Sequence, residues 1–482
     1  MSLLQPAREP SPRPRPSIDV RAAFDRVRAA QKTDPFPTYE RRIERLDRLA
    51  RAIRDRQGQI AAAISRDFGN RSIFETKLAE VLMLLDAIKY LRRNLKAWMR
   101  PQERHVAVTY KPARAKVHLM PVGVVGVISP WNYPFQLALG PTVVALAAGN
   151  RVLLKPSEYT PATSDLLQRL CEDVLDPDVV AVVPGGPEVG EAFSRLPFDH
   201  LVYTGSTHVG RLVMRAAAEN LVPVTLELGG KSPTIVHADY PVSSAAARIA
   251  WGKWSNAGQT CIAPDYLFVP EHKLPAYVEA LTACARRAYP TLRDNPDYTS
   301  IVNERHFGRL TELVEDAVAK GAHKIEIKPS AEALPPEARK IAPTLLTGVT
   351  EAMKVMQEEV FGPVLPILTY RRVEDALAYV NDHPRPLAFY YFDRDRRRVE
   401  QVLRATISGG ASINETMLHF GIDDMPFGGV GPSGMGAYHG REGFENFSHK
   451  RAVLYQARYN AASLLAPPYG ERLTRMLKLL IG

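Results

Sequence analysis

The chain has 482 residues, which exceeds the size at which a single hydrophobic core stops growing, so we expect at least two lobes. Hydrophobic residues make up 45% and charged residues 24% of the chain, a composition typical of globular proteins that excludes wholesale disorder. The formal net charge of +10 would suit an anionic ligand, but the basic residues are scattered among 52 acidic ones. We therefore predict no nucleic-acid partner.

The start of the chain and its cysteines bear on localisation. The segment Gln5–Ser17 is rich in Pro and Arg and lacks an apolar repeat, so we expect a flexible N-terminus. It has no apolar core of a secretory signal, and no run of about 18 apolar residues follows that could form a transmembrane segment. The three cysteines, Cys171, Cys261 and Cys284, are widely spaced, which favours free thiols over disulfides or a metal site. The sequence predicts a cytoplasmic protein that holds no metal.

The first part of the chain has a helical pattern. From Ile18 to about Met99 the apolar residues recur with a helical period, and arginines occupy the opposite face. One predicted helix face consists of Ile43, Leu46, Leu49, Ala50 and Ile53. Residues 104–120 then alternate apolar and polar side chains around a Pro-containing turn, which predicts a projecting hairpin. The apolar strand "KRAVLYQ" near the end would pair with this hairpin, in the same subunit or in another.

In the middle of the chain, strand-like and helical patterns of apolar residues alternate. Short β-branched runs end in Gly, Pro or Ser, as in "VGVVGVISP", "NRVLLKPSE", "VVAVVPGG", "HLVYTGS" and "VPVTLELGG", and helical stretches separate them. This pattern predicts an α/β fold with a doubly wound parallel sheet, whose ligands bind at the carboxyl ends of the strands. After Glu227 a second alternation begins, with helices expected near 245–254, 274–287 and 304–320 and strands near 267–269 and 364–369. We predict a second α/β domain there.

The stretch "WSNAGQTCIAPDY" gives Cys261 surroundings unlike those of the other thiols. A nucleophilic thiol must be accessible to substrate and partly ionised, whereas Cys171 and Cys284 lie in apolar helical stretches typical of inert, buried cysteines. On local sequence context alone, a cysteine such as Cys261 is still more often inert than catalytic.

Several separate motifs resemble those of the aldehyde dehydrogenase superfamily. They run in family order from Pro130 to Phe444, as "PWNYPFQLALGP", "KPSE", "YTGSTHVG", "LELGGKSP", "GQTCIAPDY", "EEVFGP" and "PFGGVGPSGMGAYHGREGF". The forms "WNYPF" and "GQTCIAPDY" are most similar to the class 3 branch, and within it to the bacterial coniferyl aldehyde dehydrogenase group. The resemblance implies NAD(P)-dependent oxidation of an aldehyde to a carboxylic acid.

The resemblance assigns the catalytic residues. Attack of the Cys261 thiolate on an aldehyde gives a hemithioacetal, and loss of hydride from it leaves a thioester. The Asn132 side-chain amide and the Cys261 backbone N–H would stabilise the alkoxide, and Glu227 would be the general base that activates water. Taken singly, Asn132 could be a turn former and Glu227 a surface ion-pair partner. Gly229 and Gly230, directly after Glu227, indicate a sharp bend or a close approach.

The cofactor-binding residues are also implied by the resemblance. The segment "GSTHVG" departs from the usual G-x-G-x-x-G fingerprint and by itself could be a self-capping helix start. Glu158 would bind free ribose hydroxyls and repel a 2′-phosphate, which favours NAD, with NADP also compatible. The predicted set is Ser129, Pro130, Trp131, Lys155, Ser157, Glu158, Gly205, Ser206, Val209, Leu228, Gly229, Glu359 and Phe361.

Five residues lie in segments that line the aldehyde tunnel of relatives. They are Tyr133, Trp251, Thr260, His419 and Phe420, and each could instead belong to the core. Most are aromatic, and no Arg or Lys stands out among them as a carboxylate clamp. A small-molecule aldehyde with a hydrophobic body is the expected substrate, aromatic or medium-chain aliphatic.

The same resemblance divides the chain into parts. After a flexible N-terminus at 1–17, a dinucleotide-binding domain comprises 18–103 and 121–226, and the catalytic domain with the cysteine comprises 227–445. An oligomerisation arm would consist of 104–120 and 446–458, which suggests a homodimer. The tail at 459–482 contains an amphipathic helix with Leu473, Met476, Leu477 and Leu480 on one face. That helix could lie on a membrane surface, on a partner subunit or over the tunnel mouth.

Two other functions remain open at this stage. An acylating enzyme would transfer the acyl group from the same thioester to coenzyme A, but such relatives typically lack the base at the position of Glu227. A non-catalytic binding protein is favoured only by the basic charge and the Arg-rich start. The presence of Cys261, Asn132 and Glu227 together argues against it.

Overall fold

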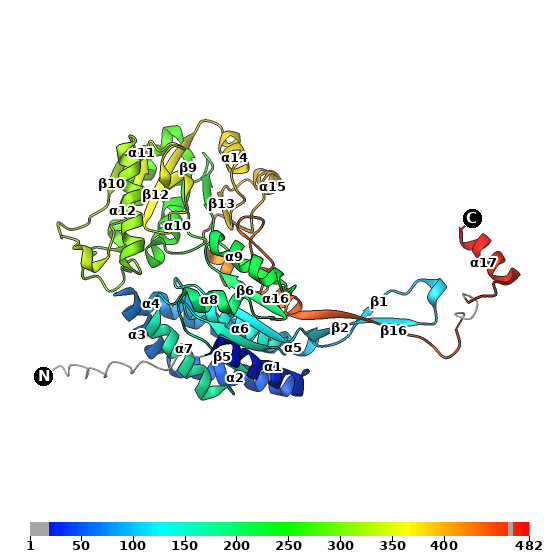
Figure 1. The fold of residues 1–482 in the computed structure, drawn as a ribbon. Helices are drawn as coiled ribbons and strands as arrows, with labels where there is room; N and C mark the ends of the chain where they lie inside the picture. The colour runs from blue at the N-terminus through cyan, green and yellow to red at the C-terminus, as the bar shows by residue number, and fades with distance from the viewer. Residues whose placement is uncertain (1–18, 461–465, 482) are drawn as a thin grey trace.

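The computed structural model describes residues 19–460 and 466–481, so the start predicted to be flexible lies outside the described residues. The described chain forms two α/β domains, one above the other in Figure 1, and a long arm that projects from the lower domain. No helix within the described ranges is long and apolar enough to cross a membrane.

The first domain is built on a six-stranded sheet with the order β15-β7-β6-β3-β4-β5, parallel except for the short β15. Every residue of β3 and β4 is buried, which explains their unbroken apolar runs, because helices cover both faces of a parallel sheet. These strands confirm the predicted doubly wound sheet. Their bounds are β3 Val124–Ile128, β4 Arg151–Lys155, β5 Val180–Val182, β6 His200–Thr204, β7 Val224–Glu227 and β15 Gly434–Met435.

Two layers of helices enclose this sheet. Val124 packs on one face with α1, α8 and α9, whereas Val125 packs on the other face with α2, α3, α5, α6 and α7. Consecutive residues of β3 thus pack in the hydrophobic cores on opposite faces of the sheet, because successive side chains of a strand point to opposite faces. The helices are α1 Val20–Thr33, α2 Tyr39–Asp55, α3 Gln57–Phe68, α4 Ile73–Thr76, α5 Met83–Trp98, α6 Gln136–Ala147, α7 Pro161–Val174, α8 Pro187–Ser194 and α9 Thr207–Ala218, with a π-helix at Lys77–Leu82 between α4 and α5.

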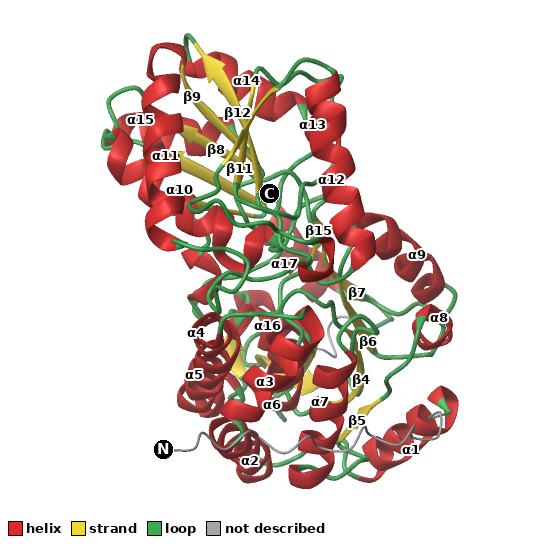
Figure 2. Cartoon of the chain, turned by 90° about the vertical axis from the view of Figure 1, so that its left-hand side faces the viewer, coloured by secondary structure: helices red, strands yellow, loops and turns green. Residues whose placement is uncertain are grey.

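The second domain holds a seven-stranded sheet with the order β10-β11-β12-β9-β8-β13-β14, of which only β10 is antiparallel to its neighbour. Helices α10 and α11 cover one face and α12 to α15 the other, as Figure 2 shows for α10 to α13. The strands are β8 Pro233–Val236, β9 Tyr266–Pro270, β10 His323–Glu326, β11 Thr344–Thr347, β12 Val364–Tyr370, β13 Ala388–Phe392 and β14 Gly410–Ile413. The helices are α10 Val242–Trp254, α11 Leu274–Ala288, α12 Glu304–Ala319, α13 Lys354–Gln357, α14 Val373–Asp382 and α15 Arg396–Ala405.

The predicted boundary of the second domain at 445 differs from the structure. Strand β15 pairs with β7 of the first sheet, and the next helix, α16 (Gly440–Asn446), buries Phe444 in the core of α2, α5 and α6. Tyr438 belongs to the same core. The chain therefore returns to the first domain before the arm begins, because these aromatic side chains are buried there.

The arm is a three-stranded sheet in the order β1-β2-β16, and Figure 1 shows it extending away from both domains. Its strands are β1 Gln102–Arg104, β2 Arg114–Pro121 and β16 Ser448–Tyr455. Strand β16 pairs antiparallel with β2 of the same chain, from Ser448 opposite Pro121 to Tyr455 opposite Arg114. The predicted pairing of "KRAVLYQ" with the hairpin is confirmed within one subunit.

The predicted amphipathic tail helix is α17, Glu471–Ile481. None of its residues is buried, and the helix lies beyond the end of the arm, well away from both domains in Figure 1. Leu477 and Leu480 are exposed on it. Its apolar face is uncovered in a single chain.

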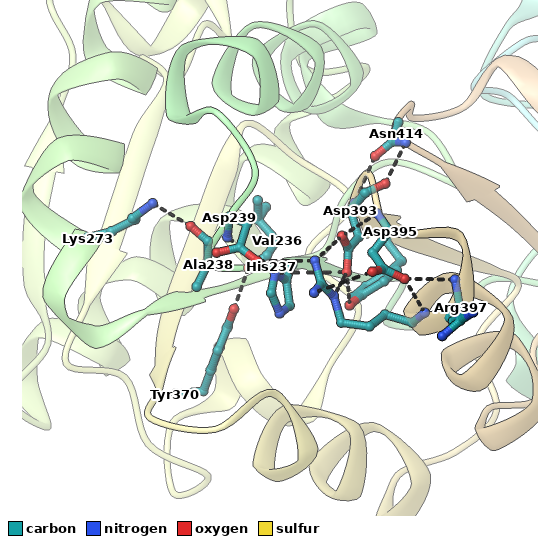
Figure 3. Close-up of polar contacts among 12 residues, drawn as sticks. Val236, His237, Ala238, Asp239, Lys273, Tyr370, Asp393, Asp395, Arg397 and Asn414 are labelled. Atoms are coloured by element: carbon teal, nitrogen blue, oxygen red, sulfur yellow. Dashed lines mark hydrogen bonds and ion pairs between the residues drawn. The ribbon is translucent and has the colours of Figure 1, made fainter.

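A cluster of charged side chains lies at the ends of β8 and β13 in the second domain, as Figure 3 shows. The buried Asp393 carboxylate accepts hydrogen bonds from Arg398 at 2.7 and 2.8 Å, and Asn414 exchanges hydrogen bonds at 2.8 Å with the Asp393 backbone. Arg248 of α10 donates to the Asn414 carbonyl oxygen. The cluster therefore joins the sheet to the helix that precedes Cys261.

We expect this cluster to stabilise the fold in a pH-dependent way. Burial alone would raise the pKa of Asp393, but hydrogen bonds from Arg398, the Asp395 amide and Tyr391 lower it to about 2. The unfolded carboxyl has a pKa of about 3.9, so the stabilisation is complete above that pH and is lost as the pH falls toward 2. Asp393→Asn should lower the free energy of unfolding at pH 7 by about 2 kcal/mol.

Urea unfolding of both proteins between pH 7 and pH 3 measures this difference, which should shrink below about pH 4. Asp239→Asn is the matched control, because Asp239 also contacts Arg398 at 3.2 Å but is 72% exposed. Its effect should stay below about 1 kcal/mol. A loss in Asp393→Asn that is the same at every pH would contradict the assignment.

Candidate active site

The loop that carries Cys261 has a rigid, unusual backbone. It follows a turn at Ser255–Gly258 in which Asn256 and Ala257 have φ values of 51° and 49°, in the left-handed region. The buried Gln259 side chain donates to the carbonyl oxygens of Asn256 at 3.0 Å and Ser300 at 3.1 Å. These bonds offset the cost of the left-handed residues and fix the loop ahead of the thiol.

Cys261 opens into a cavity of about 220 Å³ at the carboxyl ends of β3, β6 and β7. The cavity brings together all three predicted catalytic residues, Cys261, Asn132 and Glu227. Eight predicted cofactor residues line it as well: Pro130, Trp131, Gly205, Ser206, Leu228, Gly229, Glu359 and Phe361. Segments far apart in the sequence therefore meet at one hollow, at the edge of the sheet where the fold predicts a ligand.

Glu227 is placed at the end of β7, with neighbouring chains on both sides. Its carbonyl oxygen accepts from the Gly205 amide at 3.0 Å, and the next residue, Leu228, donates to Ser433 at 3.1 Å. The carboxylate itself is buried, and neither oxygen has a hydrogen-bond partner. Burial therefore raises the pKa of Glu227 well above its usual value. An unpartnered carboxylate in this position can accept a proton.

Glu359 faces the glycine pair that follows Glu227. A Cβ atom on Gly229 would lie 2.1 Å from a Glu359 carboxylate oxygen, so a larger residue would require the Glu359 side chain to move. This confirms the close approach expected from the sequence. Burial, followed by the charge of Asp265, raises the pKa of Glu359 to about 8.

The Cys261 thiol shares the cavity with both acidic groups. Burial raises its pKa, and the nearby Glu359 and Glu227 carboxylates raise it further. These surroundings favour the thiol over the thiolate in the free protein.

The other predicted cofactor residues do not line the cavity. Ser129 follows β3 and Lys155 ends the adjacent β4, and the Ser129 amide donates to the Lys155 carbonyl oxygen at 3.1 Å. The Lys155 ammonium ion-pairs with Glu158 at 2.9 Å, and the Ser157 hydroxyl accepts from a neighbouring backbone amide. Val209 is exposed on α9.

These residues fit a dinucleotide. The buried Ser129 hydroxyl has no partner, and Ser206 caps the start of α9 at the cavity, where helix amides and the helix dipole favour an anion. Among the described residues no group of His, Cys, Asp and Glu side chains could hold a metal ion.

The five predicted substrate residues lie in three places: two pairs near Cys261 and one residue apart from them. The Tyr133 hydroxyl lies 2.9 Å from the Thr260 hydroxyl, next to Cys261. His419 and Phe420 pack with Phe427, at ring distances of 6.0 and 4.7 Å, in the hydrophobic core against which Cys261 also packs. Trp251 is 48% exposed on α10 and lies outside this packing. The substrate roles of all five stay predictions.

Four residues of the lining were not predicted: Leu137, Thr204, His306 and Arg309. Thr204 directly precedes Gly205 at the end of β6, so its position in the strand could have indicated it. His306 and Arg309 lie on α12, where nothing in the local sequence distinguishes their face. The Arg309 guanidinium donates to the Glu359 and Val360 carbonyl oxygens, and the His306 ring lies 4.8 Å from Trp131.

Comparison with known proteins identifies the family of the chain. The model of the aldehyde dehydrogenase family matches residues 15–453. The chain belongs to the aldehyde dehydrogenase family. It is 48% identical to a coniferyl aldehyde dehydrogenase from a Pseudomonas species over 463 residues, which cover 96% of each chain.

Solved aldehyde dehydrogenase structures share the fold. A substrate-bound AldH from Staphylococcus aureus is 36% identical with a TM-score of 0.90, covering 96% of this chain and all of its own. An aldehyde dehydrogenase from Mycobacterium tuberculosis, solved with NAD⁺, is 30% identical with a TM-score of 0.82, covering 92% and 91%. This aldehyde dehydrogenase is accordingly an oxidoreductase that oxidises aldehydes to acids with NAD(P).

The raised pKa of Cys261 predicts how the alkylation rate of this thiol depends on pH in the aldehyde dehydrogenase without ligand. Alkylation of Cys261 by iodoacetamide should still accelerate above pH 9, beyond the value of about 8.5 for an ordinary thiol. Glu359→Gln removes one negative charge near the sulfur, worth about 1 kcal/mol, and should make alkylation at pH 9 roughly fivefold faster.

Mass spectrometry of the peptide that contains Cys261 measures the rate, and Cys261→Ala identifies the labelled site. A rate that levels off near pH 8 and is unchanged by Glu359→Gln would show that the two acidic groups do not influence the thiol.

Proposed function

We propose that this aldehyde dehydrogenase oxidises a hydrophobic aldehyde, aromatic such as coniferyl aldehyde or medium-chain aliphatic, through a thioester on Cys261. The observation that carries the proposal is the shared cavity of Cys261, Asn132 and Glu227. The named Pseudomonas relative, a coniferyl aldehyde dehydrogenase, supports the choice of substrate class.

Cys261 and Asn132 have the first roles in the reaction. The Cys261 thiolate bonds to the aldehyde carbon, and the carbon–oxygen π bond breaks so that the carbonyl oxygen becomes an alkoxide. The Asn132 amide and the Cys261 backbone N–H donate to that oxygen, each such donor being worth about 3 to 4 kcal/mol of barrier. When bound, the dinucleotide supplies the hydride acceptor. The carbon–oxygen double bond re-forms as the hydride leaves, and Cys261 then carries a thioester.

Glu227 completes the cycle as the general base. Its buried, unpartnered carboxylate takes a proton from a water molecule, which attacks the thioester and releases the acid and the Cys261 thiol. Because burial raises the pKa of Glu227, the deprotonated and active form is populated as the pH rises. Deacylation should therefore be faster in mildly alkaline solution than at pH 6.

The predicted substrate residues carry little charge. Tyr133 and Thr260 hydrogen-bond to each other, and burial lowers the pKa of His419 to about 4, which keeps its imidazole neutral at pH 7. Phe420 adds an apolar ring. A neutral, aromatic surface suits an apolar aldehyde better than the semialdehyde of a dicarboxylic acid.

For the cofactor we propose NAD in preference to NADP. Glu158 would accept hydrogen bonds from free ribose hydroxyls, with Lys155 beside it. The ion pair between them partly compensates the negative charge of Glu158, so repulsion of a 2′-phosphate is incomplete. This supports a preference for NAD that still permits NADP.

We further propose a cytoplasmic homodimer joined through the arm. Strand β16 forms an edge of the arm, and Leu454 and Tyr455 on it are exposed in the single chain. An uncovered strand edge with apolar side chains is typical of a surface that pairs with another chain. Three free cysteines suit a reducing compartment.

Glu227 also separates oxidation from the alternative, acyl transfer to coenzyme A. An acylating enzyme needs no base for water and would gain nothing from a buried carboxylate whose oxygens have no partner. A non-catalytic role is disfavoured by the same cavity.

Substitutions of the two residues separate their roles. Cys261→Ala should abolish turnover while NAD still binds, because only the nucleophile is lost. Glu227→Gln should give a burst of NADH of about one equivalent and then stall, because the thioester forms but is not hydrolysed. Stopped-flow absorbance of NADH and calorimetric NAD binding measure both. Normal steady-state turnover of either variant at neutral pH would contradict its assigned role.

The substrate proposal is tested by kcat/KM for a panel of aldehydes with each nucleotide. We expect coniferyl aldehyde and medium-chain aliphatic aldehydes to exceed a carboxylate-bearing semialdehyde by about tenfold or more, since leaving a charge in a neutral pocket is costly. The kcat/KM measured with NAD should exceed that measured with NADP, and Glu158→Gln should reduce the difference between the two. Equal efficiency with the semialdehyde would refute the hydrophobic class.

A further inference from the structure

We propose that Arg71, held by Glu80, is a positioning residue that fixes the Asn132 amide relative to Cys261. Neither residue lines the cavity, and both act through the backbone around Asn132. The inference rests on the proposed role of Asn132 in stabilising the alkoxide.

The Asn132 carbonyl oxygen is held from two directions. Arg71 donates to it at 2.8 Å, and the Asn256 side-chain amide donates at 3.1 Å. Arg71 belongs to the first domain, whereas Asn256 lies in the loop that leads to Cys261. This one oxygen therefore ties the Asn132 loop to the cysteine loop, and the relative position of amide and sulfur depends on it.

Glu80 holds the other end of the same loop. Its carboxylate accepts from the backbone amides of Phe135 at 2.8 Å and Gln136 at 3.1 Å, where α6 begins. It also ion-pairs with Arg71 at 3.0 Å, and both side chains are fully buried. The seven-residue loop 129–135 between β3 and α6 is thus clamped at Asn132 and at its end by one pair of charges.

The surroundings hold Arg71 in a single orientation. Its guanidinium lies 4.6 Å from the centre of the Tyr133 ring and 5.2 Å from that of Phe68, distances typical of cation–π contacts. The Glu75 carboxylate is also close enough to interact with Arg71, and it accepts from the Asn256 backbone amide at 3.1 Å. Both donors to the Asn132 carbonyl are therefore held by acidic side chains from α4 and the π-helix.

A π-helix explains how Glu80 reaches this loop. The extra residue in the turn at Lys77–Leu82 changes the helical phase and turns Glu80 inward, while Leu78 and Leu82 remain exposed. A buried ion pair adds little net stability compared with apolar side chains. The contribution of the Arg71–Glu80 pair is therefore the position that it gives to the loop. The geometry it sets is that of the proposed alkoxide donor.

The test is Arg71→Gln. A misplacement of about 1 Å can cost about a hundredfold in rate, and a lost alkoxide donor costs about a hundredfold or more. We therefore expect kcat to fall about 10- to 100-fold, with KM for NAD nearly unchanged and with a primary isotope effect from 1-deuterated aldehyde. Arg71→Lys, which can still donate to the Asn132 carbonyl, should restore part of the rate.

Arg42→Gln is the matched control. Arg42 is also a buried arginine that donates to backbone carbonyls, those of Pro37 at 2.9 Å and Ala147 at 3.1 Å, but Ala147 is at the far end of α6. It should destabilise the protein about as much as Arg71→Gln and leave kcat within about twofold. An equal fall of kcat in both variants would reduce the Arg71 effect to general destabilisation and overturn the proposal.

A double-substitution cycle shows whether Arg71 acts through Asn132. If it does, Arg71→Gln should lower kcat much less in an Asn132→Ala background than in the wild type. Additive losses would overturn the proposal. If Asn132→Ala itself leaves kcat unchanged, the role proposed for Asn132 fails instead, so the two failures are distinguishable. Glu80→Gln, which keeps an oxygen for the amides of α6, provides a second variant in case Arg71→Gln does not fold.

Discussion

The carbonyl oxygen of Asn132 accepts hydrogen bonds from Arg71 at 2.8 Å and from Asn256 at 3.1 Å, and these donors come from opposite sides of the domain boundary. The proposed reaction requires the Asn132 amide and the Cys261 sulfur, which belong to separate domains, to lie within a few ångströms of one carbonyl group. Covalent connection cannot ensure this, because about 130 residues separate Asn132 from Cys261 along the chain. Two hydrogen bonds to one oxygen, backed by buried carboxylates, provide the constraint instead.

The chemistry of the cavity follows from its low polarity. Glu227, Glu359 and Cys261 are three acidic groups in one hollow, and burial raises the pKa of each. The raised pKa values favour the protonated form of each group, which avoids placing several negative charges close together. In the proposed mechanism, Cys261 and Glu227 therefore act only after they have lost their protons.

Much of this arrangement could be predicted from the sequence where the signal is local. Runs of β-branched residues predict the buried strands, whereas the local surroundings of Cys261 only distinguish it from the other two cysteines, and its catalytic role is implied by the family resemblance. The constraint on Gly229 was expected, although its partner, Glu359, was not. His306 and Arg309 were missed because the face of α12 that meets the cavity is set by packing between distant elements. The Arg71–Glu80 pair was missed for the same reason, since a π-helix leaves no clear periodic signature.

Strand β15 has a consequence for the order in which the enzyme becomes complete. Residues 434–435 add to the sheet beside β7, whose last residue is Glu227. On a ribosome, β7 emerges long before β15, and during that interval β7 is an uncovered edge of the first sheet. The edge of the first sheet beside Glu227 is therefore covered only after the second domain has been synthesised.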